Sequence, residues 1–81
     1  MKVELLYVHG CPHVSAARHV LQSSLKEVGL EVAVEEHEGA YPSPTILVDG
    51  KDVMGAPASA APVCRLDTPT RERVLAALRR E

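Results

Sequence analysis

The residues with the clearest chemical potential are a cysteine and its histidine neighbours in the stretch YVHGCPHV, residues 7–14. Cys11 follows a short apolar run and precedes a helix-like pattern, which places it at or next to the N-cap of a helix. Backbone N–H groups and the positive end of a helix stabilise a thiolate there, and a protonated His13 adds to the effect. A thiolate attacks disulfides and binds metals. The position therefore indicates a reactive Cys11, with a small buried hydrophobic thiol as the alternative.

The two histidines beside Cys11 raise the question of a metal site. His9, Cys11 and His13 have the spacing His-x-Cys-x-His, which offers three ligands where structural zinc sites usually have four. We therefore interpret His13 as a residue that tunes the thiol and His9 as a loop residue, and we predict neither a metal nor a cofactor. His19 and His37 are interpreted as solvated surface histidines.

The second cysteine, Cys64, lies in a long loop that opens at Gly55 and is rich in alanine and proline. Long loops without secondary structure of their own are often functional. Two interpretations stay open. Cys64 resolves a mixed disulfide on Cys11, which requires Cα atoms within about 7 Å, or it pins the loop to the core through Val63 and Leu66.

The elements that must position these residues begin with a mostly buried strand over residues 2–8. A helix follows, in which Pro12 suits the first position and Gly29 the C-cap. The pattern of residues 30–37 alternates between apolar and polar side chains, which predicts a strand with one solvated face. The apolar stripe of the helix comprises Val14, Ala17, Leu21, Leu25 and Val28.

The second half of the chain predicts a hairpin and a closing helix. Strands are expected over residues 45–48 and 51–54, joined at Asp49-Gly50, since both central residues of a tight hairpin turn need positive φ. Thr68 is expected to cap the last helix, with Pro69 in its first turn. The order β-α-β-β-β-α predicts an α/β fold with a four-stranded mixed sheet and two helices.

Size and composition limit the classes of function. With 81 residues, we expect one small domain spanning 1–81. A net charge of −2 and two tyrosines as the only aromatic residues argue against nucleic-acid or anionic-membrane partners. The first ten residues, which include Lys2, Glu4 and His9, do not read as a signal peptide. Two cysteines are too few for a secreted multi-disulfide framework, so we expect a cytoplasmic protein.

Three features in this order resemble the thioredoxin fold across nearly the whole chain. They are the cysteine of GCPHV, the stretch SPTILVDGK, similar to the cis-proline strand and hairpin of thioredoxins and glutaredoxins, and the closing amphipathic helix. The triplet CPH also matches the start of the Cys-Pro-His-Cys site of DsbA-like oxidases. The chain departs from the family where Val14 replaces the second cysteine, where the helix before SPT is missing, and where the glutathione-binding Gly-Asp pattern of glutaredoxins has no clear match. The heavy-metal-associated domain fits less well, because its pattern ends on a strand and carries Cys-x-x-Cys.

The resemblance implies roles for several residues. Cys11 is the nucleophile, Pro44 is the cis-proline beside it, and the backbone of Ser43 hydrogen-bonds an extended substrate, with Pro12 also in the substrate-binding set. The expected function is thiol–disulfide exchange with a protein or a low-molecular-weight thiol or disulfide, and Cys64 is the candidate resolving thiol.

Two other functions stay open at this point. The loss of the adjacent cysteine at Val14 favours a catalytically silent thioredoxin-like binding scaffold. Soft-metal or organomercurial binding through Cys11 and Cys64 is the third hypothesis.

Overall fold

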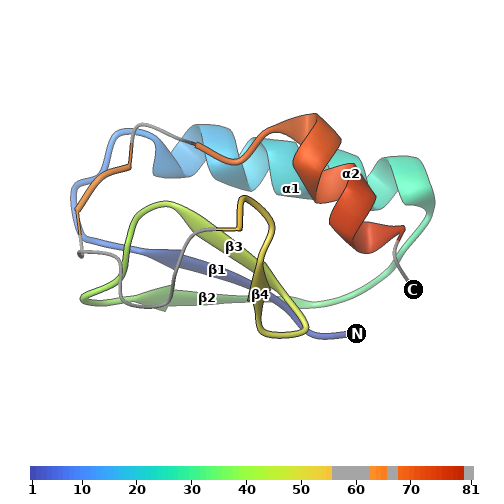
Figure 1. Ribbon diagram of the computed structural model, residues 1–81, viewed down its shortest axis with the longest axis horizontal. Helices are drawn as coiled ribbons and strands as arrows, with labels where there is room; N and C mark the ends of the chain where they lie inside the picture. Colours follow the sequence, from blue (N-terminus) through green and yellow to red (C-terminus); the bar gives the residue numbers. More distant parts are fainter. Residues whose placement is uncertain (56–62, 66–67, 80–81) are drawn as a thin grey trace.

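The chain folds in the order β1–α1–β2–β3–β4–α2 (Figure 1), as the sequence patterns predict. The computed structural model describes residues 1–55, 63–65 and 68–79. Within these ranges no helix is long and apolar enough to cross a membrane. The elements are β1 Val3–Tyr7, α1 Val14–Val28, β2 Val34–Glu38, β3 Thr45–Val48, β4 Lys51–Asp52 and α2 Arg71–Leu78.

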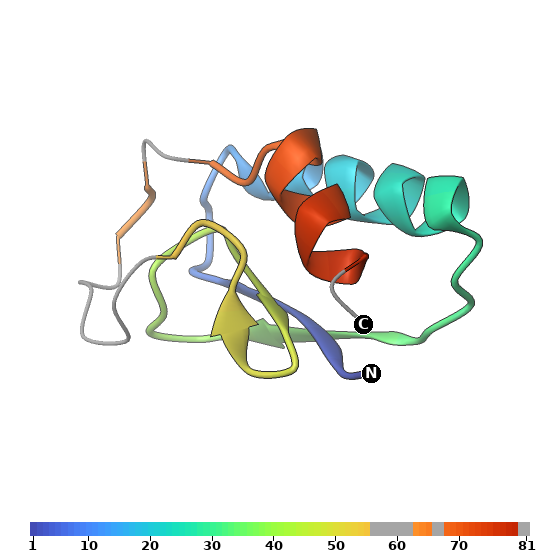
Figure 2. The same cartoon turned by 45° about the vertical axis from the view of Figure 1, so that its right-hand side comes forward.

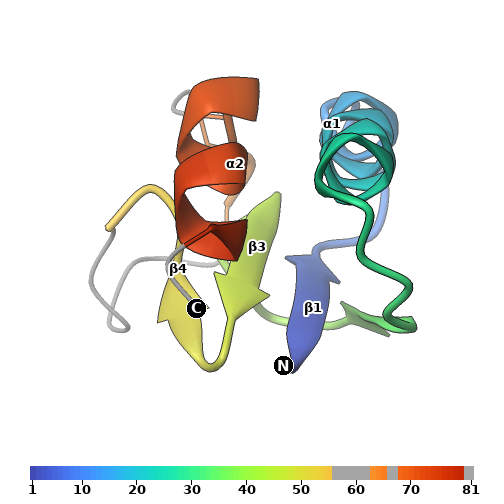
Figure 3. The same ribbon diagram turned by 90° about the vertical axis from the view of Figure 1, so that its right-hand side faces the viewer.

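The four strands form one mixed sheet in the order β2-β1-β3-β4. Strands β1 and β2 are parallel, while the β1–β3 and β3–β4 pairs are antiparallel. Both helices lie on the same face of the sheet, as Figures 2 and 3 show from two further directions. The predicted class, a four-stranded mixed sheet with two helices, is therefore confirmed.

The core lies between this sheet and the helices. Alternate residues of β1 and β3 face the helices in register, so that Val3 lies opposite Val48 and Leu5 opposite Ile46. Because the chain has almost no aromatic residues, aliphatic side chains fill this layer. Among the described residues, the fully buried aliphatic members of the core are Val3, Leu5, Leu21, Ile46 and Val74.

Helix α1 begins two residues later than the sequence predicts. Pro12 does not open the helix, since Pro12 and His13 form a turn in which the Val14 N–H donates to the Cys11 carbonyl over 3.4 Å. His13, not Cys11, is the N-cap residue. The predicted C-cap is confirmed: Gly29 has φ 72°, the left-handed conformation that glycine adopts most easily.

The predicted second strand starts four residues too early. The Leu30 N–H donates to the carbonyl of Leu25 and completes the helix cap, so it belongs to the end of α1. Strand β2 begins only at Val34, where the chain lies opposite Val3, the first residue of β1.

The hairpin between β3 and β4 forms as predicted, with φ 51° at Asp49 and φ 80° at Gly50. Strand β4 ends at Asp52, two residues earlier than predicted. The Asp52 side chain accepts a hydrogen bond from the Met54 N–H at 2.8 Å, and the Gly55 N–H donates to the Asp52 carbonyl. These local bonds turn the chain away from the sheet.

The prediction that Thr68 caps the last helix is wrong. Helix α2 begins at Arg71, and its N-cap is Thr70, whose hydroxyl accepts a hydrogen bond from the Arg73 N–H. Pro69 lies before the helix and not in its first turn, and it is buried. The two threonines flank this proline, and the extended backbone of Thr70, with φ −97° and ψ 153°, suits an N-cap.

Candidate thiol site

The structure joins the two cysteines whose relation the sequence leaves open. Cys11 and Cys64 form a disulfide across a sequence separation of 53, with their Cα atoms 5.7 Å apart. Both residues are half-buried. The disulfide links the connection between β1 and α1 to the segment 63–65, which lie at the same end of the molecule (Figure 1).

Two consecutive turns present Cys11 just before α1. The Cys11 N–H donates to the Val8 carbonyl, and the Cys11 carbonyl accepts from Val14. Gly10 has φ 80°, a backbone conformation that residues with a Cβ rarely adopt. Pro12, the next residue, is exposed. Backbone hydrogen bonds therefore fix the position of Cys11, and the residue that follows it is exposed to solvent.

Backbone pairing with Ser43 positions Cys64. The Ser43 N–H donates to the Val63 carbonyl over 2.9 Å, and the Arg65 N–H donates to the Ser43 carbonyl. These two bonds make an isolated parallel bridge between Ser43 and Cys64. Both backbone polar groups of Ser43, the predicted substrate-binding pair, thus contact the chain's own segment.

The Ser43–Pro44 peptide bond is cis, as the resemblance implies for Pro44. Ser43 and Pro44 are both fully buried. The Ser43 hydroxyl has no hydrogen-bond partner among the described residues. Ser43 therefore hydrogen-bonds to the segment 63–65 through its backbone and not through its hydroxyl.

A buried charge network fixes the residue after Cys64. Arg65 is 7% exposed, and its Nη1 lies 2.8 Å from Asp52 Oδ2 and 3.0 Å from Thr45 Oγ1. The Thr45 hydroxyl donates to the Pro42 carbonyl. We call Arg65, Asp52 and Thr45 the Arg65 clamp. Removing one partner of such a buried ion pair typically costs about 3–5 kcal/mol, because it leaves an uncompensated charge.

The Arg65 clamp is the part of the site that sequence reasoning missed. The available signal was an arginine directly after a cysteine, in a loop otherwise rich in alanine and proline. Its carboxylate partner lies 13 residues earlier, at the end of β4. Val63 is 58% exposed, which argues against the alternative that Cys64 pins the loop to the core through Val63 and Leu66, while Leu66 lies outside the described residues.

The histidines lie around the site without converging on it. His13, which was predicted to tune the thiol, is exposed at the N-cap of α1. The His9 side chain is 92% exposed, and its Nδ1 lies 3.4 Å from Glu38, in agreement with a loop residue. His9 and His13 are close to Cys11 in the sequence, but their imidazoles do not form a compact site with the disulfide.

One cluster of metal-type ligands occurs elsewhere in the described ranges. Glu4, Glu35 and His37 on β1 and β2 have ligand atoms within 4.8 Å of one another. The His37 side chain is 40% exposed and lies near both carboxylates. Exposed acidic groups often gather in this way on neighbouring strands, so we interpret the cluster as surface charge.

A bidentate ion pair ties α1 to the edge strand β2. Arg18 donates two hydrogen bonds, of 2.9 and 2.8 Å, to the Glu36 carboxylate. These hydrogen bonds lower the pKa of Glu36 and raise the pKa of Arg18. Because both side chains are partly exposed, solvent screens the pair and limits its effect on stability.

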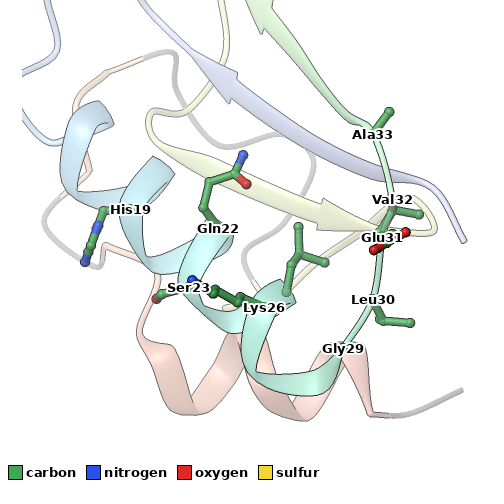
Figure 4. Close-up of a pocket in the computed structure, with 10 residues that line it drawn as sticks. His19, Gln22, Ser23, Lys26, Gly29, Leu30, Glu31, Val32 and Ala33 are labelled. Atoms are coloured by element: carbon green, nitrogen blue, oxygen red, sulfur yellow. The ribbon is translucent and has the colours of Figure 1, made fainter.

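A groove between α1 and the connection to β2 contains neither cysteine (Figure 4). The figure shows Gln22 and Lys26 of the helix opposite Glu31 and Val32 of the connection. The groove and the disulfide therefore involve different parts of the chain, and the groove is not part of the thiol site.

Comparisons with protein-family models, with curated proteins and with solved structures find no match to this chain.

Proposed function

We propose that this chain is a thioredoxin-like thiol–disulfide exchange protein in which Cys11 and Cys64 cycle between dithiol and disulfide. The observation that carries the proposal is the Cys11–Cys64 pair itself, drawn together across 53 positions beside the cis peptide of Pro44. The order of strands and the position of both helices on one face also support a thioredoxin-like scaffold. In this arrangement Cys64 takes the place of the missing cysteine at Val14.

Cys11 is the attacking thiol in this proposal. It lies in a turn that leads into α1 and is followed by the exposed residues Pro12 and His13, whereas Cys64 lies in a backbone bridge to the buried residue Ser43. Nearby backbone N–H groups of the helix end favour the thiolate of Cys11. The proposal assigns substrate contact to Pro12 and thiol tuning to His13, because both exposed residues directly follow Cys11 in the chain.

The reaction balances as two consecutive exchanges. The Cys11 thiolate attacks a substrate disulfide R–S–S–R′, forms a Cys11–S–S–R bond and releases R′S⁻. The Cys64 thiolate then attacks the Cys11 sulfur, forms the internal disulfide and releases RS⁻. The protein is oxidised by two electrons, the substrate is reduced by two electrons, and the two protons pass from the cysteines to the released thiolates.

Aryl disulfide trapping tests the proposal. With 5,5′-dithiobis(2-nitrobenzoate) in limiting amount, the reduced wild-type chain should release both thionitrobenzoate groups, because Cys64 resolves the first adduct. Cys64→Ser should release one group and retain the other on Cys11. Cys11→Ser should react more slowly at neutral pH. Equal rates for the two cysteines would reject the nucleophile assignment and favour the thioredoxin-like binding scaffold with a structural disulfide.

A second candidate is soft-metal or organomercurial binding, which the proximity of the two sulfurs favours. The Cα atoms of the two cysteines lie 5.7 Å apart in the disulfide, and two thiolates that keep this separation after reduction would suit two-coordinate binding of a thiophilic ion. Titration of the reduced protein with Hg²⁺ or Cu⁺ should then give a tight one-to-one complex that Cys64→Ser weakens. Weak binding, equal in both proteins, would reject this candidate.

A further inference from the structure

The segment 63–65 is held in place by more than its disulfide. Its backbone makes two hydrogen bonds to Ser43, and the Arg65 side chain contacts Asp52 and Thr45. The carboxylate of Asp52 is itself only 11% exposed. These contacts do not involve a sulfur atom, so they are available to the reduced chain as well.

We propose that Arg65 is a positioning residue for the thiol pair: through the Arg65 clamp it keeps Cys64 opposite Cys11 when the disulfide is reduced. The role of Arg65 in thiol–disulfide exchange rests on the proposed function, whereas its effect on the equilibrium between the dithiol and the disulfide does not.

The physical effect is on the effective concentration of the Cys64 thiol at Cys11. With the clamp formed, Cys64 is one residue from a fixed point, so little chain freedom is lost when the disulfide closes. Without it, the two backbone hydrogen bonds to Ser43 remain to hold the segment 63–65, and closure of the disulfide must restrict more of the backbone freedom of Cys64. The clamp and the disulfide order the same residues, so by linkage each stabilises the other.

The choice of arginine fits this role. A guanidinium presents several N–H donors in a rigid plane, and here its Nη1 lies within hydrogen-bond distance of both the Asp52 carboxylate and the Thr45 hydroxyl. A lysine has its charge on a flexible stem without this rigid plane. Arg65→Lys should therefore restore only part of the positioning that Arg65→Met removes.

The equilibrium with glutathione measures this effect directly. One glutathione disulfide oxidises the two protein thiols to the internal disulfide and yields two glutathione molecules, with Cys11–glutathione as the intermediate. The effective concentration follows from the oxidised and reduced fractions after acid quenching, thiol labelling and mass spectrometry. Each variant is checked for native circular dichroism in its oxidised and reduced forms.

We expect Arg65→Met to lower the effective concentration at least tenfold and to increase the Cys11–glutathione fraction. Arg65→Lys should lie between this variant and wild type. The double variant Arg65→Met with Asp52→Asn removes both charges of the Arg65–Asp52 pair and should show the same loss. Arg18→Met is the control, since it breaks an arginine–carboxylate ion pair between α1 and β2 that contains neither cysteine nor a member of the Arg65 clamp, and it should leave the equilibrium unchanged.

Two results would overturn the proposal: an effective concentration within twofold of wild type in the double variant, or an equal loss in Arg18→Met. The aryl disulfide test is independent of both. If Cys11 is not preferentially reactive but the Arg65 variants lose effective concentration, the proposed function fails and the positioning role stands. If Cys11 is reactive and the variants match wild type, only the positioning role fails.

Discussion

Reducing the Cys11–Cys64 disulfide is predicted to lower the free energy of unfolding by about 4 kcal/mol, according to the chain-entropy relation for a closed loop of this length. The relevant length is the separation of 53 positions between the two cysteines, most of the chain. The main effect lies in the unfolded state, which gains freedom when the cross-link is removed. For a domain of this size, the melting temperature should fall by roughly 15–30 °C.

This difference in the free energy of unfolding also determines how much more readily the disulfide forms in the native chain than in the unfolded chain. A stabilisation of about 4 kcal/mol corresponds to roughly a thousandfold higher effective concentration of the two thiols in the native chain than in the unfolded chain. The full value requires that the reduced native chain keep Cys64 in place. The Arg65 clamp meets this requirement, so Arg65→Met should reduce the difference in stability between the oxidised and reduced forms.

Urea unfolding followed by far-ultraviolet circular dichroism, with and without a phosphine reductant, measures this quantity. The double variant Cys11→Ser with Cys64→Ser provides a reductant-free control and should match the reduced wild type. A difference below about 1 kcal/mol would refute the reasoning, because it is far from the loop-closure value for a separation of this length.

Three further predictions concern the scaffold. Ile46→Ala, at a fully buried position, should cost about 2–5 kcal/mol in urea unfolding, whereas Leu30→Ala at an exposed position should change stability by less than about 0.5 kcal/mol. Thr70→Ala should cost about 1 kcal/mol through loss of the α2 N-cap, and Thr70→Ser should recover most of it. The pKa of Glu36 is lowered below its ordinary value of 4.5 by its hydrogen bond with Arg18, so its contribution is present above that value and is lost as the pH falls through the folded pKa. Glu36→Gln should remove this acid-dependent part, which is at most about 1 kcal/mol for a partly exposed pair; an unchanged acid profile would contradict the assignment.

Local turn chemistry explains which elements could be predicted. Asp49-Gly50 specifies a tight hairpin because both residues tolerate positive φ, so β3 and its turn follow from a few adjacent residues. Gly29 marks the end of α1 for the same kind of reason. The start of α2 was misplaced because Thr68 and Thr70 are both acceptable caps, and the choice depends on the burial of Pro69 between them.

The thiol site depends on tertiary contacts that no local pattern specifies. The sequence places Cys11 before a helix and suggests Cys64 as its partner, yet their distance depends on how the segment 63–65 pairs with Ser43. That pairing is a single bridge, without the repeated alternation that predicts a strand. Arg65 was missed for the same reason, since its partner Asp52 lies in another part of the chain.

The backbone hydrogen bonds of Ser43 bear on which reductants the oxidised chain would accept under the proposed function. Because its N–H and carbonyl are both bonded to the segment 63–65, an extended peptide gains no backbone pairing at Ser43 until that segment leaves. A small thiol needs no such pairing and approaches Cys11 from the side of Pro12 and His13, which are exposed. Under the proposed function, this geometry favours low-molecular-weight thiols as reductants of the disulfide, because backbone recognition of an extended peptide at Ser43 would require the segment 63–65 and its Arg65 clamp to separate from Ser43.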